Sequence, residues 1–255
     1  MAKIKTKEAE NNEEMDLEEE WDKLESEFKN EKGELIAPDV NEITVTKLGG
    51  SDGFDNDDVS FPKLQIAQGV GPLSDLYPKG SIVLDKEMEI AKMGSKPVEI
   101  TVLRMVKSFE ENVPFGGDEL PRIAKSKEEV LKLGGTTSWS TEDGQRIPPS
   151  FKPCADALIC IKQPEGLDED WFPFEFNGEN YTFCMWKIKG MAYKSSAIAI
   201  NTAGKTYYMK GLHTGSLMLT TEAEKVNSNT VAVPHIKKGK KHSDDFIEWL
   251  SEFVG

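Results

Sequence analysis

Long apolar runs are missing from the sequence, in which no stretch approaches the roughly 20 residues of a membrane-spanning helix. The first residues also lack the apolar segment of a secretory signal peptide. Cysteine is scarce, with three among 255 residues, so at least one thiol stays unpaired in a monomer. These absences predict a soluble protein with reduced thiols that makes no membrane contact and resides in the cytoplasm, or in the host cytoplasm if it is viral.

Motifs of catalysis and cofactor binding are missing as well. The chain has three histidines and no G-x-S-x-G, P-loop or H-E-x-x-H pattern. Gly69-Val70-Gly71 lacks the third glycine of a dinucleotide-binding fingerprint. Cys154, Cys160 and Cys184 lack the two-residue spacing of a zinc knuckle, so buried thiols are the simpler interpretation and zinc binding stays open. We expect a protein that is not an enzyme and has no cofactor or metal; an enzyme with an unrecognised site is a weaker alternative.

Charge is distributed unevenly along the chain. Residues 1–58 hold 7 lysines and 19 acidic residues, a net charge of −12. Residues 243–255 add four acidic residues and no basic one. Because the whole chain carries −14, residues 59–242 carry about +2. This division predicts an acidic N-terminal extension (1–58), a near-neutral body (59–242) and an acidic C-terminal segment (243–255).

The N-terminal extension contains one amphipathic pattern. Leu17, Trp21, Leu24 and Phe28 recur at spacings of 4, 3 and 4, which places them on one stripe of a helix over residues 13–29. Such a stripe docks on the protein's own body or binds a partner, and the pattern does not separate these two possibilities. Residues 35–60, with their glycines and aspartates, read as a linker.

The body reads as mainly β with a few helices. Strands are predicted over 61–68, 81–90, 98–106, 157–162, 171–176, 181–189, 207–221 and 230–236. Helices are predicted over 126–133, capped by Ser126, over 191–201 and over 244–253. Asn177-Gly178 indicates a tight hairpin, and residues 134–153 an excursion from the core. This pattern favours a β-barrel or sandwich with two or three inserted helices.

Basic and aromatic side chains interleave within the body, as a sequence-tolerant binder of single-stranded nucleic acid requires. Each of these residues by itself is better explained as core or as ordinary surface, but the cluster as a whole favours function. The predicted contacts to nucleic acid are Arg104, Lys107, Trp186, Lys187, Lys189, Tyr193, Tyr207 and Lys210. If Trp186 is a stacking platform, Trp186→Ala should weaken binding by about 1–3 kcal/mol.

The C-terminal segment is acidic and aromatic and follows the basic run 237–241. As a free tail it would compete with phosphate for the binding surface, and its apolar tip would contact partner proteins. As a packed amphipathic helix it would place Phe246, Leu250 and Phe253 on one buried face. Both interpretations are kept at this stage.

The run Phe61-Pro62-Lys63-Leu64-Gln65-Ile66-Ala67-Gln68, followed by a Gly/Pro turn and a Gly-Ser step into a strand, resembles the opening of a group of bacteriophage single-stranded-DNA-binding proteins. The similarity continues through the cysteine-bearing segment from Pro153, the strand 181–189, the Ser- and Ala-rich helix 191–201 and the strands of 207–236. The resemblance implies an oligonucleotide/oligosaccharide-binding (OB) type β-barrel with inserted helices. Three cysteines are fewer than some members have, and the N-terminal extension lies outside the similarity.

The sequence therefore predicts a single-stranded-DNA-binding protein that acts stoichiometrically in phage DNA replication, recombination or repair. Its partners would be single-stranded DNA and, through the acidic termini, replication or recombination proteins. The alternative is a protein-interaction module that binds a host factor or mimics DNA through the acidic N-terminal helix.

Overall fold

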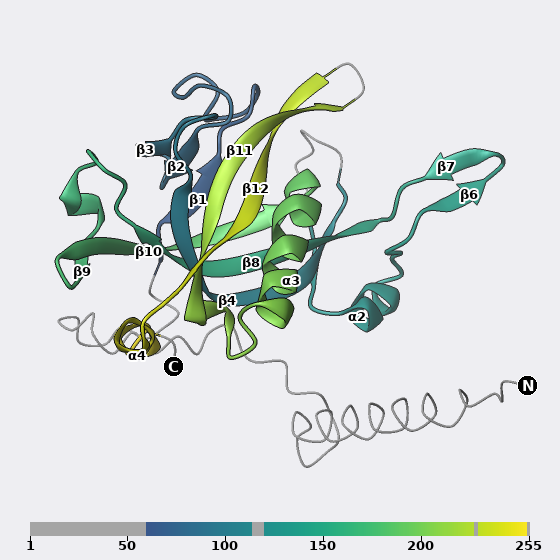
Figure 1. Ribbon diagram of the computed structural model, residues 1–255. Coiled ribbons are helices and arrows are strands. Elements are labelled where there is room, and N and C mark those ends of the chain that lie inside the picture. Colours follow the sequence, from purple (N-terminus) through teal and green to yellow (C-terminus); the bar gives the residue numbers. More distant parts are fainter. Residues whose placement is uncertain (1–59, 114–119, 227–228, 254–255) are drawn as a thin grey trace, which may run out of the picture. The chain divides into compact units, whose positions relative to one another are not determined.

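The computed structural model describes residues 60–113, 120–226 and 229–253 (Figure 1). The strands are β1 (Lys63–Ile66), β2 (Ile82–Leu84), β3 (Met88–Ala91), β4 (Val98–Glu111), β5 (Ile123–Ala124), β6 (Ser140–Glu142), β7 (Gln145–Ile147), β8 (Phe151–Lys162), β9 (Phe174–Phe176), β10 (Glu179–Lys189), β11 (Gly215–Val226) and β12 (Asn229–Lys241). The helices are α2 (Lys127–Lys132), η2 (Glu169–Trp171), η3 (Tyr193–Ala197), α3 (Ile198–Thr206), η4 (Leu212–Thr214) and α4 (Asp244–Ser251). The predicted fold class, mainly β with a few helices, is confirmed at this level.

One sheet dominates the described part of the chain, and it curls into a half-barrel. Its strand order is β12-β11-β4-β8-β10-β1-β2-β3, with β5 on β4 and β9 on β10. Neighbouring strands are antiparallel except β1 and β10, which run parallel. The long strands β4 and β8 pair over most of their length, with a bulge between Val102 and Arg104 that bends β4.

The main core lies on the inner side of the curled sheet, beneath η3 and α3 (Figure 1). Alternate residues of the central strands point into it, among them Ile100, Ile159, Trp186 and Leu217. Ala197, Ile200 and Ala203 close it from the helix side. A second, aromatic cluster lies on the outer face, where α4 packs against β9 and β10.

Local signals in the sequence placed several elements correctly. Ser126 caps α2 by accepting a hydrogen bond from the backbone N–H of Glu129. Asn177 and Gly178 have φ of 50° and 76°, as a tight turn between β9 and β10 requires. The predicted excursion over 134–153 carries the small β6–β7 hairpin, which projects from the body in Figure 1, but it ends earlier than expected because β8 begins at Phe151, which is fully buried.

Other predictions need correction. The strand expected over 81–90 is a hairpin, β2–β3, which turns at Asp85 and Lys86 with φ of 48° and 65°. The strand expected from residue 207 begins only at Gly215, after a turn and η4. The predicted helix and linker of residues 1–59 lie outside the described residues.

Candidate nucleic-acid interface

A groove of about 820 Å³ lies among the described residues at the place where β1 separates from β10. Its walls come from β1, β10, the start of the η3 segment and β12. It is lined by Lys63, Leu64, Gln65, Ile66, Gln68, Asp156, Met185, Trp186, Lys187, Lys189, Met191, Ala192 and residues 231–234. Apolar side chains supply most of this lining, and lysines stand along the rim.

The groove exists because β1 pairs with β10 over two positions only, Lys63 with Met185 and Leu64 with Trp186. Beyond them β1 is held by β2 on its other side, through Gln65–Val83 and Ile66–Ile82. The β10 strand continues to Lys189 and pairs with β8 throughout. The separation of β1 from β10 leaves the opening that β12 borders.

Side chains close the sheet across this opening. Three carbonyls at alternate positions of β12 accept hydrogen bonds from side chains. The Thr230 carbonyl accepts from Lys79, and the Ala232 carbonyl accepts from Gln68. The Pro234 carbonyl accepts from both Ser195 and Ser196. Gln68 also accepts from the N–H of Ala232 at 3.1 Å. We call this set of contacts the side-chain seam. It satisfies an edge strand that would otherwise offer unpaired backbone groups to other chains.

Three of the predicted contacts, Trp186, Lys187 and Lys189, line the groove, and the two lysines are already paired. Their ammonium nitrogens lie 2.9 and 2.6 Å from the carboxylate of Glu110, whose side chain is 13% exposed. Burial raises the pKa of Glu110, but hydrogen bonds from Lys189 and Lys187 outweigh it and lower the pKa overall. A phosphate would have to compete with Glu110 for these two lysines. Lys63, on the opposite wall, is exposed.

Trp186 does not have the exposure that the sequence interpretation assumed. It is 2% exposed and packs in the main core, so it cannot offer a ring face to a base. Tyr193 is half-buried at the start of η3 and packs against the same core. The η3 turn is a π-helix, an irregularity that often marks functional sites, and it follows directly on the groove residues Met191 and Ala192.

The remaining predicted contacts lie apart from the groove lining. Arg104 is half-buried at the bulge of β4. Lys107 is exposed, with its ammonium 5.1 Å from the ring centroid of Phe109. Tyr207 is 53% exposed beyond the end of α3, with the ammonium of Lys238 4.4 Å from its ring centroid, and Lys210 is exposed nearby in sequence. The structure thus separates the predicted set into groove, core and surface groups.

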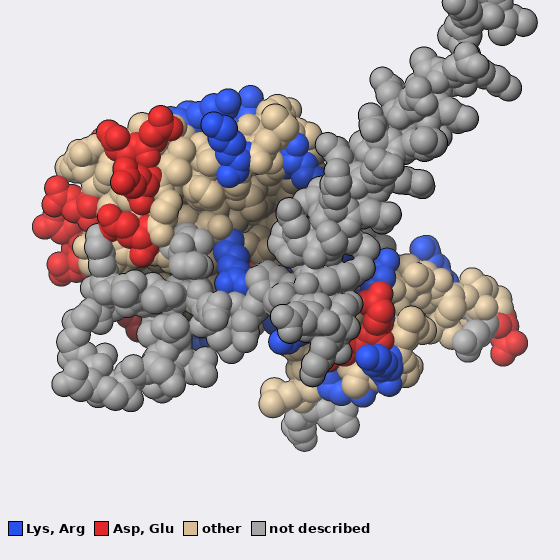
Figure 2. All heavy atoms as spheres, turned by 90° about the horizontal axis from the view of Figure 1, so that it is seen from below, with Lys and Arg blue, Asp and Glu red and all other residues tan. Residues whose placement is uncertain are grey.

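Charge on the surface is segregated. Figure 2 shows a large group of acidic side chains at one end of the described body, smaller acidic groups on the opposite side, and lysines and arginines in separate groups over that face. Four exposed acids follow closely in sequence before and within β9: Asp168, Glu169, Asp170 and Glu175. A large acidic group of this kind repels a polyanion from its immediate surroundings.

The C-terminal segment is a packed helix and not a free tail. Ser243 caps α4, and Phe246 and Leu250 are 5% and 0% exposed on the outer face of β10. Phe253 is half-buried and lies 4.5 Å, centroid to centroid, from Phe183. In this docked state these three side chains contact the protein's own sheet, as the packed-helix alternative expected, and their role in binding a partner stays a prediction. The acidic residues of α4 remain exposed.

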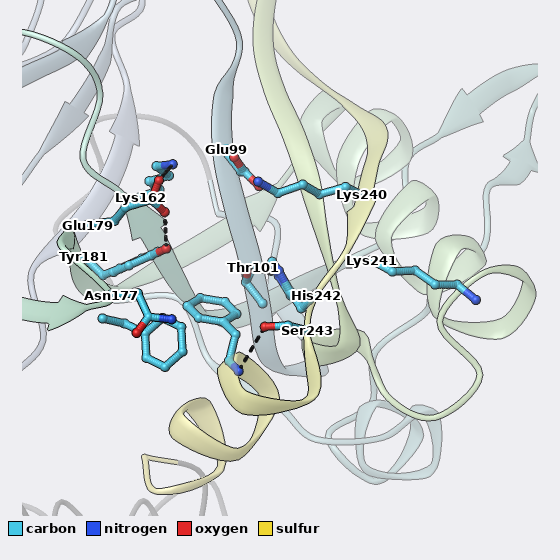
Figure 3. Close-up of a pocket in the computed structure, with 12 residues that line it drawn as sticks. Glu99, Thr101, Lys162, Asn177, Glu179, Tyr181, Lys240, Lys241, His242 and Ser243 are labelled. Carbon is cyan, nitrogen blue, oxygen red and sulfur yellow. Dashed lines mark hydrogen bonds and ion pairs between the residues drawn. The ribbon is translucent and has the colours of Figure 1, made fainter.

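A smaller polar cavity of about 210 Å³ lies where β12 runs into α4 (Figure 3). His242 Nε2 lies 2.8 Å from Thr101 Oγ1, and its ring packs 4.5 Å from that of Phe246. Burial lowers the pKa of His242 to about 4, against the opposing effect of Glu99. Other polar groups pair among themselves: Lys240 with Glu99, and both Lys162 and the Tyr181 hydroxyl with Glu179. We interpret this cavity as part of the joint that holds α4.

The three cysteines are buried and unpaired. Cys154 Sγ lies 3.1 Å from Ser108 Oγ, and burial raises the pKa of all three thiols. No cluster of three or more potential metal ligands was found among the described residues. Within the same residues, no helix has the length and apolar character to span a bilayer.

Comparison with known proteins gave no match: no family model, curated protein or solved structure resembles the chain significantly.

The remaining predicted partner contacts lie outside the described residues; they are Leu17, Trp21, Leu24 and Phe28. Sequence reasoning missed the groove residues Lys63, Gln65 and Gln68. Their strand was recognised, but nothing in the sequence indicated that it would leave β10 and face β12.

Proposed function

We propose that the chain is a single-stranded-DNA-binding protein and that its curled sheet is an OB-like barrel. The bound strand lies in the groove between β1, β10 and β12. The observation that carries this proposal is the combination in that groove of a mainly apolar lining with three lysines, Lys63, Lys187 and Lys189. Unpaired bases require apolar surface, and the phosphates that accompany them require cations.

Three further features support the assignment. The groove, at about 820 Å³, is as large as pockets that hold drug-sized ligands, and it is open along one side. Strands β4 and β8 are long, antiparallel and bent by a bulge, as strands of a small barrel are. Tyr207, exposed beside Lys238, offers a ring for stacking outside the groove.

The mechanism needs no bond to be made or broken. Coating a single strand melts hairpins and excludes nucleases in proportion to the protein bound, and affinity falls with salt as counterions return to the phosphates. The exposed acids of α4, Asp244, Asp245 and Glu248 among them, would repel DNA from the outer face and leave the groove as the favoured path.

The proposal is tested by fluorescence anisotropy with a labelled oligo-dT of about 30 nucleotides, over a range of salt concentrations. We expect binding to oligo-dT, little binding to a matching duplex, and a salt slope that falls by about one unit in Lys63→Gln. Lys132→Gln, on the exposed face of α2, is the matched control and should keep the wild-type slope. Absence of oligo-dT binding, or equal slopes in both variants, would contradict the groove as the binding site.

A further inference from the structure

Gln65 carries a side-chain oxygen that has no hydrogen-bond partner among the described residues. Its Oε1 is shut off from solvent and accepts no hydrogen bond from the described residues. Buried carbonyl oxygens of this kind are nearly always bonded, so each exception calls for an explanation. The other side-chain atom found in this condition within the described residues, Thr220 Oγ1, lies outside the groove lining, whereas Gln65 lies within it.

A second glutamine on the same segment, Gln68, has both groups of its side-chain amide hydrogen-bonded. Gln68 Nε2 donates to the carbonyl of Ala232 at 2.8 Å, and Gln68 Oε1 accepts from the Ala232 N–H at 3.1 Å. Both ends of that amide are used for the side-chain seam. Gln65 stands three residues earlier and makes no such contact, although it borders the same groove. Among the described residues this oxygen has no hydrogen bond to lose when the amide rotates toward a ligand in the groove.

The surroundings of Gln65 define the ligand's chemistry. The groove offers apolar surface from Met185, Met191 and β12, and lysine ammonium groups at its rim. The apolar surface suits a flat apolar group, the Gln65 oxygen suits an N–H donor, and the lysines suit a negative charge. An unpaired nucleobase on its phosphate backbone combines these three properties. Glutamine can both donate to and accept from the edge of a base.

We propose that Gln65 is a base-contacting residue: its amide turns its oxygen to the N–H donor of an unpaired base held in the groove. This inference rests on the proposed function and deepens it. In a duplex the imino N–H of each thymine or guanine is already used in pairing, so the contact favours single strands. Since every common base has at least one N–H donor, Gln65 contributes base dependence without a strict sequence preference.

The test compares two probes of about 30 nucleotides, oligo-dT and oligo-N3-methyl-dT, which lacks the single N–H donor of thymine. We expect the wild-type protein to bind oligo-dT about 2- to 10-fold more tightly than the methylated probe, as one neutral hydrogen bond allows. In Gln65→Met, which keeps side-chain volume and removes the amide, this ratio should fall to about one. Thr220→Val, which removes the other unpartnered atom outside the groove lining, should keep the wild-type ratio.

A ratio in Gln65→Met equal to the wild-type ratio would overturn the role of Gln65 and leave the proposed function standing. A wild-type protein that binds neither probe would overturn the proposed function, and this inference with it. Unfolding gives a readout independent of DNA: Gln65→Met should raise the denaturation midpoint, because it removes a buried oxygen that has no partner among the described residues. A lowered midpoint would show that the amide is bonded in the folded protein, against the proposal.

Discussion

The side-chain amide of Gln68 binds both backbone groups of Ala232, 164 residues further along the chain, with donor–acceptor distances of 2.8 and 3.1 Å. In doing so it takes the place of a strand at the exposed edge of β12. The curled sheet is thus closed at this point by side chains, and the groove lies beside the closure.

Gln68→Met should destabilise the protein. The substitution keeps the side-chain volume but leaves the N–H and C=O of Ala232, which is 4% exposed, without partners. We expect a loss of about 1–3 kcal/mol in the free energy of unfolding, measured by chemical denaturation. The amide hydrogen of Ala232 should also exchange faster. Unchanged exchange at Ala232 would show that the seam does not protect this edge.

Trp186→Ala should act on folding. Because the indole is 2% exposed in the main core, its removal leaves a cavity and should cost about 3–5 kcal/mol of unfolding free energy. Trp186→Phe should lose less. If Trp186→Ala were as stable as the wild type but bound oligo-dT more weakly, the stacking role inferred from the sequence would be restored.

Tyr207→Ala should weaken binding to oligo-dT by about 1–3 kcal/mol while leaving stability nearly unchanged, because the ring is 53% exposed. Anisotropy titrations measure the first effect and thermal unfolding the second. Met209→Ala provides a control, since Met209 is 82% exposed in the same turn and has no ring. Equal affinities for the two variants would exclude stacking on Tyr207.

Leu250→Ala should loosen the C-terminal helix. The Leu250 side chain is fully buried between α4 and the sheet. If α4 unfolds together with the body, truncation of this side chain should lower the free energy of unfolding by about 2–5 kcal/mol. Glu248→Ala, an exposed substitution on the same helix, should be nearly neutral. In limited proteolysis, the first cleavage of the Leu250→Ala variant should fall within residues 243–255. Equal resistance of both variants would mean that α4 does not depend on this contact.

The protein should lose stability as pH falls from about 6.5 to about 4 through His242. An unfolded histidine has a pKa of about 6.5, whereas burial lowers the pKa of His242 to about 4 in the folded protein. Protons therefore bind the unfolded chain first, and the folded state is disfavoured progressively across this range. His242→Gln should flatten the pH dependence of the denaturation midpoint between these values. A slope unchanged in His242→Gln would contradict this assignment.

Local structure could be predicted from the sequence because its causes are local. The cap at Ser126 and the turn at Asn177-Gly178 depend on neighbours within a few residues. Strand β10 shows a feature that local sequence could not predict. Phe183 and Trp186 lie on opposite faces and are both buried, since α4 covers one face and the main core the other. The strand was recognisable, but its two buried faces left no alternation from which to tell that Trp186 points inward.

The candidate site could not be predicted for a related reason. Lys187 and Lys189 were recognised as basic, yet their partner Glu110 lies 77 and 79 residues away in sequence. The groove depends on where β1 leaves β10, and that point is set by how β2 and β3 pair with β1 and with each other. Such long-range pairings have no signature in a single sequence.

The side-chain seam also has an evolutionary consequence. In a barrel closed by backbone ladders, a change of width requires a shift of register along whole strands, which moves every core residue to the other face. Here the closure depends on Gln68, Lys79, Ser195 and Ser196. Point substitutions at these positions can therefore widen or narrow the groove while the core is preserved. In this architecture, single substitutions can change the width of the groove one residue at a time.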